Sequence, residues 1–559
     1  MNRTSDTDGP GTLRSAGSGR RHALLALAAC SALVLGACSS PAQEKKSSAP
    51  VDPDAWVVDT PQAKSARDAV TWNLLLEPAK IDPAESNNYG ESTVVSNLCE
   101  SLQKQNPDFS ISDGLASVKA SADGLTLVYT INPDATFWDG KPVTADDVAF
   151  SLTRAWKPKG SPYWTAYYAH VQSIEATGDR QVTVTLTQPD ALFQKMMSTS
   201  AGGIVEKAYS EQHPNFGTPK TPPMCTGPYK FGSWKSGSQI VIERNDHYWG
   251  GTEPKVARIT FSILQGDATQ TKALTGDAID GTYQPPFTAL GQLEKHGHVY
   301  YGKSLLTFYL IPTRKPGPLQ DPRIRKALFL ALNRDAVAQT AFAGAAQASR
   351  SMVAQSAYGD VTPTRSKTTG GTDGDLAEAK KLVQEAGSPK AVIKLAGNPG
   401  ITDSLTQTLQ ALAEAGQKIG LNTVYKSVTM GQFYGLFGSP NGWKAVDADG
   451  FGAQYNFPVA DPQSQYRIWA NPKDYENYGA FNDPESSKLI DQASATIDPS
   501  QRDDLLARAD ARLFDQMPWI PVVDVASTLY LNKDVTGPPA SFVYWWYPWA
   551  ADLGGSSAG

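Results

Sequence analysis

TFWDGKPVTADDVAFS, residues 136–151, combines a turn with the start of a helix. Asp139-Gly140 is a turn signal, since Asp bonds its own backbone and glycine accepts unusual backbone angles. Thr144 followed three residues later by Asp147 predicts a capped helix start, with Asp in place of the more usual Glu. Apolar residues then fall on one helical face, at Val148, Leu152, Ala155 and Trp156. The stretch therefore predicts a turn followed by an amphipathic helix.

Other segments alternate between strand and helix patterns. Residues 125–131 and 181–187 alternate apolar and polar side chains, as half-buried strands do. Residues 392–395 and 421–428 read as strands, and between them a helix ends at Gly420, its apolar positions being Leu405, Leu409, Leu412 and Ile419. A strand, a helix and a strand in this order predict locally parallel sheet, and hence an α/β protein.

Composition narrows the classes of protein that need to be considered. The chain has 559 residues, of which 40% are hydrophobic, so it can bury a large core. A formal net charge of −6 argues against a nucleic-acid partner, because phosphate binding needs a concentrated basic surface. Four cysteines in a chain of this length exclude a small disulfide-rich scaffold.

Motifs for catalysis are sparse. The sequence has no P-loop, no His-Glu-x-x-His and no dinucleotide glycine fingerprint. Asp146 and Asp147 could be read as catalytic carboxylates, but the first turn of a helix favours capping for both. His296-Gly297-His298 fits a solvated turn better than a metal site. We therefore predict no enzyme activity, no cofactor and no metal, while a secreted hydrolase with scattered carboxylates stays open.

The N-terminus predicts export and lipidation. Arg14, Arg20 and Arg21 precede an apolar run over residues 23–34, which is too short to span a bilayer comfortably. Leu35-Gly36-Ala37-Cys38 follows, the pattern of a bacterial lipoprotein signal cut before the cysteine. We predict a signal peptide over residues 1–37, lipidation of Cys38 and a Ser/Pro-rich tether over residues 38–65. An ordinary secretory signal, a membrane anchor and export by the twin-arginine route are the alternatives.

Two further cysteines would then lie in an oxidising compartment. Cys99 and Cys225 are the cysteines of the mature body, and we predict a disulfide between them. The alternative is that each is a separately buried thiol.

Several segments, taken together and in order, resemble the family of ABC-importer solute-binding proteins that contains dipeptide-, oligopeptide- and nickel-binding proteins. Residues 136–151 resemble the most diagnostic stretch of that family. The other similar segments are Ile81-Asp82-Pro83 (an "LDP" turn), residues 225–231 ("GTGPY", with Cys225 for the first Gly), residues 244–249 ("RNPDYW") and residues 321–328 with Asn333-Arg334.

The resemblance implies a periplasmic-binding-protein-like α/β fold with two lobes, the second inserted into the first. Lobe I would comprise residues 66–303 plus 518–559, with an extra subdomain at about 100–210, and lobe II residues 304–517. A small-molecule or peptide ligand would bind between hinged lobes, and the closed form would meet an ABC permease and its ATPase subunits. The implied protein is a monomer that is lipid-anchored at the extracytoplasmic face of the bacterial cell membrane, and no nucleic acid binds it.

The resemblance also suggests ligand contacts. A "GW-x-x-DY" segment of oligopeptide-binding relatives carries an Asp that pairs with the amine of the peptide, and residues 450–456 are similar, with Phe451 and Gly452 in the motif and Gln454 in place of that Asp. Asp447 and Asp449 are nearby carboxylates that could substitute. Asn87, Asn88 and Tyr89 follow the LDP turn, and Gln432 and Phe433 lie near an aromatic that lines the family's cleft. Each could equally be ordinary loop or core.

Gln454 decides which ligand is expected. A neutral amide cannot neutralise a buried ammonium, so the substitution favours a blocked or modified peptide. An oligosaccharide or another neutral solute is the alternative, supported by the aromatic content. The aromatic run over residues 544–549 could stack on such a ligand, but burial of the C-terminal segment is the better interpretation.

Overall fold

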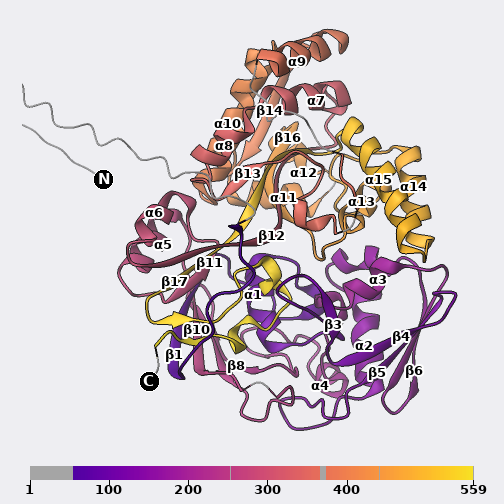
Figure 1. The fold of residues 1–559 in the computed structure, drawn as a ribbon, viewed down its shortest axis with the longest axis vertical. Coiled ribbons are helices and arrows are strands. Elements are labelled where there is room, and N and C mark those ends of the chain that lie inside the picture. Colours follow the sequence, from indigo (N-terminus) through magenta and orange to yellow (C-terminus); the bar gives the residue numbers. More distant parts are fainter. Residues whose placement is uncertain (1–54, 252, 360, 365–372, 440, 558–559) are drawn as a thin grey trace, which may run out of the picture. The chain divides into compact units, whose positions relative to one another are not determined.

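Two long antiparallel strands, β12 (Gly297–Pro312) and β17 (Ile520–Asn532), lie in the middle of an eleven-stranded sheet in the computed structural model (Figure 1). The structure describes residues 55–557 except 252, 360, 365–372 and 440. Every residue of β17 is buried, which explains its nearly continuous apolar sequence. The pairing of β12 with β17 shifts register between Gly302 and Leu306. Gly302 is required there, because a Cβ would collide with the carbonyl oxygen of Ala540.

One end of this sheet, here called the first end, continues from β17. Its strands are β11 (Gly281–Tyr283), β1 (Arg67–Leu74), β10 (Val256–Ile263), β9 (Gln239–Arg244) and β8 (Tyr229–Lys235). β1 is parallel to both β10 and β11, and the pairs from β10 to β8 are antiparallel. Trp72, Leu74 and Phe261 are fully buried side chains of this part of the core.

The other end, the second end, continues from β12. Its strands are β16 (Gly450–Asn456), β14 (Val392–Gly397) and β15 (Asn422–Ser427), while β13 (Ala346–Ala348) pairs with β17. β14 and β15 are parallel and are connected by α10 (Asp403–Lys418). Gly420 follows this helix with a φ of +90°, a conformation that glycine adopts without strain. The predicted strand–helix–strand unit is therefore confirmed.

The diagnostic stretch forms the elements expected of it, beside a small separate sheet. Helix α2 (Ala145–Trp156) starts at a capping box in which Thr144 and Asp147 bond each other's backbone N–H groups. The small sheet has the order β4-β5-β7-β6, with bounds Ala116–Ala120, Thr126–Ile131, Gln181–Leu186 and Val171–Gly178. A two-stranded ribbon lies nearby in sequence, β2 (Gln103–Gln105) and β3 (Ile111–Asp113).

The remaining helices and strands cover and connect these sheets. They are α1 (Tyr89–Leu98), α3 (Ala191–Met196), α4 (Lys207–Gln212), α5 (Asp267–Thr275), α6 (Leu290–Leu293), α7 (Pro322–Ala331), α8 (Arg334–Thr340), α9 (Asp373–Glu385), α11 (Met430–Gly438), α12 (Gly442–Val446), α13 (Gln463–Ala470), α14 (Pro484–Ala495), α15 (Pro499–Gln516), β18 (Val535–Thr536) and β19 (Gly554–Gly555). In the described residues, no helix has the length and apolarity needed to cross a membrane. The predicted signal peptide, Cys38 and all but the last residues of the tether lie outside the described residues.

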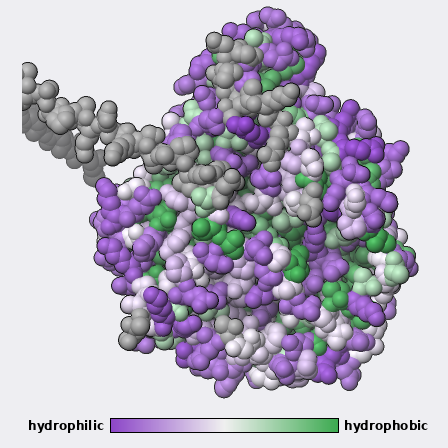
Figure 2. Space-filling model, viewed as in Figure 1, coloured by the Kyte–Doolittle hydropathy of each residue, from purple (hydrophilic) through white to green (hydrophobic). Residues whose placement is uncertain are grey.

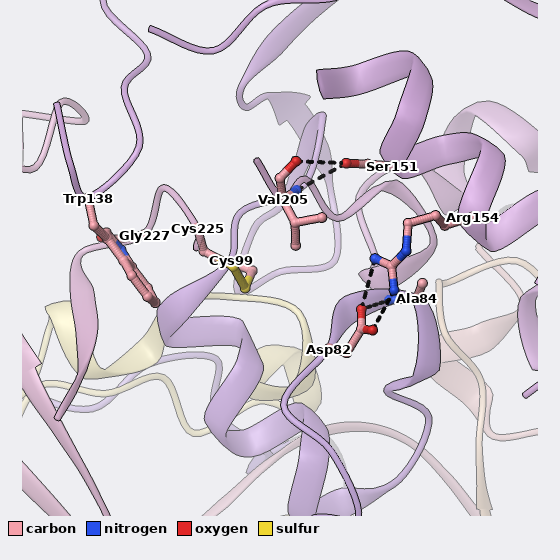
Figure 3. Close-up of a disulfide and its surroundings, with 9 residues drawn as sticks. All are labelled: Asp82, Ala84, Cys99, Trp138, Ser151, Arg154, Val205, Cys225 and Gly227. Atoms are coloured by element: carbon pink, nitrogen blue, oxygen red, sulfur yellow. Dashed lines mark hydrogen bonds and ion pairs between the residues drawn. A yellow bond between two sulfur atoms is a disulfide. The ribbon is translucent and has the colours of Figure 1, made fainter. Parts of the chain in front are cut away.

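A disulfide ties the C-terminal end of α1 to the loop before β8 (Figure 3). Cys99 and Cys225, whose pairing the sequence predicts, have Cα atoms 4.9 Å apart and are separated by 126 residues. A cross-link over so long a loop stabilises the folded state by about 4 kcal/mol, chiefly by restricting the unfolded chain. Figure 3 also shows Asp82 of the LDP-like turn, which accepts a hydrogen bond of 3.1 Å from Arg154 of α2. The LDP-like turn is thereby held against helix α2, which begins within the diagnostic stretch.

The C-terminal aromatic run is buried, as the sequence analysis favours. Trp549 is fully buried, donates a hydrogen bond from Nε1 to the Thr93 carbonyl oxygen at 3.1 Å, and packs at a tilt against Trp72 with ring centroids 4.4 Å apart. The Tyr544 ring stacks on the Tyr283 ring, with ring centroids 3.7 Å apart. The run therefore holds the end of the chain against α1 and the first end of the sheet.

Candidate functional site

A cavity of about 370 Å³ lies where segments from both ends of the large sheet come together. This ligand cavity, as we call it from here on, is lined by Leu75, Leu76, Asn87, Asn88, Tyr89, Tyr163, Gln284, Leu306, Phe308, Ile401, Thr402, Leu405, Phe433, Tyr434, Phe437, Gly452, Ala453, Gln454, Tyr455, Asn456, Tyr475, Glu476, Tyr478 and Trp545. The volume suits a small molecule or short peptide. On the face drawn in Figure 2, hydrophobic side chains form scattered patches among hydrophilic ones.

One wall of the ligand cavity is the start of α1. Asn88 caps this helix, its Oδ1 accepting a hydrogen bond of 3.2 Å from the Glu91 N–H. Asn87 donates from Nδ2 to the Ser161 hydroxyl at 3.3 Å. Tyr89 is buried and donates from its hydroxyl to the Tyr283 carbonyl oxygen at 3.0 Å. These three residues are positioned by the helix start, so their polar groups are partly engaged before any ligand arrives.

The opposite wall comes from β16 and α11. Gly452 and Gln454 of β16 line the ligand cavity, as does Phe433 of α11. Gly452 fits because a Cβ would lie 2.9 Å from both Leu409 and Phe308, which is too close for packed carbon atoms. Six of the nine predicted contacts therefore meet in one cavity, namely Asn87, Asn88, Tyr89, Phe433, Gly452 and Gln454. Their role in binding stays a prediction.

The other three predicted contacts lie outside that lining. Gln432 is the third residue of α11, and its Oε1 completes a capping box by accepting from the Thr429 N–H at 3.0 Å. Phe451 is fully buried and packs against Phe437, a lining residue, with ring centroids 4.9 Å apart. Asp449 is buried beside Lys315, with its Oδ2 3.0 Å from the ammonium nitrogen. Asp449 is thus already neutralised within the protein.

Sequence reasoning missed Glu476, which the fold brings into the ligand cavity. Glu476 is only 6% exposed, and its carboxylate accepts a hydrogen bond from the Tyr455 hydroxyl. Burial raises its pKa to about 8. The signal that could have found it is the alternation of acidic and aromatic residues in Asp474-Tyr475-Glu476-Asn477-Tyr478. This alternation alone does not identify the acid that turns inward.

The chemistry of the described lining is aromatic, amide-bearing and nearly uncharged. Glu476 is the one carboxyl group among these lining residues, and none of them is Lys, Arg or His. Two buried donors of the lining, Asn456 Nδ2 and Trp545 Nε1, find no hydrogen-bond partner among the described residues. Tyr434 and Tyr475 are 44% and 37% exposed, so they form part of the mouth. Such a surface can bind apolar or aromatic groups and orient them through a few hydrogen bonds.

Metal ligands do not gather anywhere in the part of the chain that the structure describes, where no group of three His, Cys, Asp or Glu side chains could hold an ion. His296 lies just before β12, and His298 is the second residue of that strand. The His296 ring forms a hydrogen bond of 3.0 Å with the Gln292 carbonyl oxygen.

Comparison with known proteins agrees with this architecture. Residues 93–477 match the family described as bacterial extracellular solute-binding proteins, family 5 Middle. The periplasmic oligopeptide-binding protein OppA of Salmonella typhimurium is 26% identical over 508 residues, which cover 83% of this chain and 87% of that protein. The glutathione-binding protein GsiB of Pectobacterium atrosepticum is 24% identical, with 82% and 88% covered.

A solved structure shares the fold at lower sequence similarity. The murein tripeptide binding protein MppA of Escherichia coli superposes with a TM-score of 0.76 at 21% identity, covering 88% of this chain and 99% of that one. The predicted fold class, a two-lobed α/β fold like that of periplasmic binding proteins, is confirmed. The names of these proteins describe several different ligands, so the common fold does not by itself identify one.

Proposed function

The chain belongs to family 5 of the bacterial extracellular solute-binding proteins, and we propose that it is a lipid-anchored receptor that delivers a peptide or modified peptide to an ABC importer. The observation that carries this proposal is the ligand cavity, which residues before β12 and residues after it line together. The ligand cavity is complete only when both parts of the chain contribute their lining residues. Binding would therefore hold them together, and the permease would recognise the closed form.

The proposed lobes are residues 66–303 plus 518–559 and residues 304–517, joined by β12 and β17. Support comes from the register shift between Gly302 and Leu306, which lies at the proposed boundary in β12. The extra subdomain at about 100–210 would correspond to the small four-stranded sheet with α2 and α3. Strands that cross from one lobe to the other act as a hinge, since a few residues absorb the change in backbone angles.

Contacts across the proposed lobe boundary support a closed arrangement. Lys195 of α3 forms an ion pair with Asp461, with Nζ and Oδ2 2.7 Å apart. The Asp403 N–H at the start of α10 donates to Asp267 Oδ2 of α5 at 3.3 Å. Tyr167 donates from its hydroxyl to the Ser464 carbonyl oxygen at 3.3 Å. A bound ligand would add to these contacts and shift the population further toward closure.

A neutral solute, such as an oligosaccharide, is the second candidate. It is favoured by the aromatic side chains of the ligand cavity together with the amides of Asn87, Gln284, Gln454 and Asn456. Flat apolar faces of sugars stack on aromatic rings while amides bond hydroxyl groups. The hydrolase that the sequence left open would need a convergent carboxylate pair, whereas the described lining contains a single carboxyl group.

The decisive experiment is mass spectrometry of small molecules released when the purified protein is denatured. We expect a peptide or modified peptide in stoichiometric amount, and its titration into stripped protein should give one site per chain. Release of a glycan would replace the peptide with the second candidate. Catalytic turnover of the released compound by the intact protein would contradict the role of a receptor.

The lipid anchor is tested by Cys38→Ala. We expect the variant to fold but to leave the membrane fraction, because the acyl chains at Cys38 would be its only durable attachment. Fractionation of cells before and after a salt wash measures this, with the unchanged protein as the control. A variant that still sediments fully with washed membranes would contradict lipidation at Cys38.

A further inference from the structure

Glu476 is a buried carboxyl group in the lining of the ligand cavity for which the described residues supply no cation. Asp449 is paired with Lys315, and Asp461 is paired with Lys195 and Arg502. Among the described residues, Glu476 has no ion pair, and its side chain is bonded by the Tyr455 hydroxyl instead. A buried carboxylate is costly unless a positive group accompanies it. The missing partner of Glu476 is therefore to be sought in the ligand.

The surroundings of Glu476 favour a cation. Tyr455, Tyr475 and Tyr478 lie beside it in the lining, and Tyr163 approaches from the other wall. Aromatic faces attract ammonium and guanidinium groups, most strongly where water is excluded. No Lys, Arg or His among the described lining residues would repel such a group. For the same reason, no described cation of the lining would form an ion pair with a carboxylate of the ligand.

We propose that Glu476 is the anionic contact of the site, and that the ligand cavity selects a molecule with one cationic group and an apolar body, without a free carboxylate. The proposal rests on the receptor function proposed above and names its ligand class. Gln454 of β16 carries no charge, and in this proposal the negative charge that pairs with the ligand belongs instead to Glu476, in the loop before α14. An amidated peptide with a free amine, or another apolar organic amine, fits this description.

Groups around Glu476 define how binding depends on pH. The phenols of Tyr163, Tyr167 and Tyr478 lie near it, and burial raises the pKa of each of them well above its usual value, so these three stay neutral. The Tyr455 hydroxyl donates its hydrogen bond to Glu476. Asp474 is the nearby carboxyl; burial raises its pKa, and Arg467 opposes that rise. Arg467 itself lies over the Tyr167 ring, 4.6 Å from its centroid.

Glu476 would therefore be protonated in the empty site below a pH of about 8, and a cation would have to displace that proton. The affinity for a permanently charged ligand should fall about tenfold for each pH unit well below this value. A neutral ligand would show no such dependence. The pH profile thus reports whether the carboxylate contacts a cation.

Three matched probes test the proposal by calorimetry: leucyl-phenylalanine amide, its N-acetyl derivative and free leucyl-phenylalanine. We expect the amide with its free amine to bind at least tenfold more tightly than the other two. Glu476→Gln should abolish that preference while leaving the acetylated probe unchanged. Glu100→Gln is the matched control, since Glu100 is a half-buried carboxyl that also accepts a hydrogen bond, of 2.6 Å, from a tyrosine, Tyr248, but lies outside the ligand cavity.

The outcomes separate this inference from the receptor function. If the acetylated probe binds as tightly as the amine, or if Glu476→Gln keeps the preference, the cation site is wrong while the receptor function stands. If the unchanged protein binds no probe and releases no small molecule on denaturation, both are wrong. If Glu476→Gln does not fold, the pH profile and the charge of the molecule released from the unchanged protein decide, and a neutral or anionic molecule overturns the proposal.

Discussion

Asp461 and Glu476 are two buried carboxylates, 1% and 6% exposed, that lie fifteen positions apart between β16 and α14. Asp461 accepts hydrogen bonds from Arg502 at 2.9 and 2.8 Å and pairs with Lys195. Among the described residues, the only side-chain group that donates a hydrogen bond to the Glu476 carboxyl is the Tyr455 hydroxyl. Burial alone would raise the pKa of Asp461, but Lys195 and Arg502 together lower it, whereas burial raises the pKa of Glu476 to about 8. The protein neutralises Asp461, which marks that carboxylate as structural, whereas Glu476 lines the ligand cavity without a described cation.

The largest expected effect comes from removing the charge of Asp461, the carboxylate that the protein neutralises. Asp461→Asn should lower the free energy of unfolding by about 3–5 kcal/mol, because it leaves the buried Arg502 without its carboxylate. Urea denaturation at neutral pH measures the loss. Glu485→Gln is the control, since Glu485 pairs with Arg512 at the surface and should matter little. A loss as small as that of the control would remove the distinction between the two carboxylates.

A second unpaired carboxylate in the ligand cavity would sharpen the comparison. Gln454→Asp should strengthen binding of a free-amine peptide amide by about 1.5–3 kcal/mol relative to its acetylated form, through an added charge-assisted hydrogen bond. Calorimetry with the same pair of probes on both proteins measures the change. If the variant discriminates no better than the parent, Gln454 does not contact the charged end of the ligand.

The two carboxylates should also have opposite effects on stability as pH changes. Glu476 has a folded pKa above its unfolded value, so its burial costs nothing at low pH and destabilises the empty protein increasingly as pH rises toward 8. Glu476→Gln should therefore raise the free energy of unfolding at pH 8 and give no gain at pH 4. Asp461 has a lowered pKa, so its stabilising contribution is present above the usual Asp range and is lost as pH falls below it. Thermal unfolding across this range tests both signs, and a Glu476→Gln variant whose gain is equal at both pH values would contradict them.

The smallest expected effect concerns the outer partner of Asp461. Lys195→Met should lower the free energy of unfolding by less than about 1 kcal/mol, because Lys195 is 39% exposed and Arg502 still neutralises the carboxylate. Since Lys195 and Asp461 belong to different proposed lobes, ligand affinity should fall about two- to fivefold as the closed form is weakened. Calorimetry and denaturation on one preparation separate the two effects. A large loss of stability with unchanged affinity would assign the ion pair to folding alone.

Much of the candidate site was predictable from local sequence. Asn87, Asn88 and Tyr89 follow a recognisable turn, and Gly452 and Gln454 alternate on a strand, so their common placement in the ligand cavity agrees with the motifs. Gln432 could have been identified as a cap, because Thr429-x-x-Gln432 is a capping-box pattern. Phe451 is buried against Phe437, which does line the cavity.

Glu476 and Asp449 show where local reasoning ends. Neither residue's surroundings follow from its neighbours in the chain, since Asp449 meets Lys315, 134 positions away, and Glu476 meets Tyr455, 21 positions away. From the sequence, Asp449 was the natural substitute for the missing countercharge. The tertiary structure instead neutralises Asp449 and leaves Glu476 in the lining without a described cation.

The sequence by itself determined the local elements of this protein: the capped helix after Asp139-Gly140, the parallel unit around α10 and the order of the family's motifs. Helix caps, turns and alternation depend on residues within a few positions of one another, so they can be read from a single chain. Only the tertiary structure decided which buried carboxylate receives a cation, because Lys195 and Asp461 stand 266 positions apart and meet through the packing of separate parts. The free energy of a buried charge depends on every group around it, and those groups are chosen by the fold.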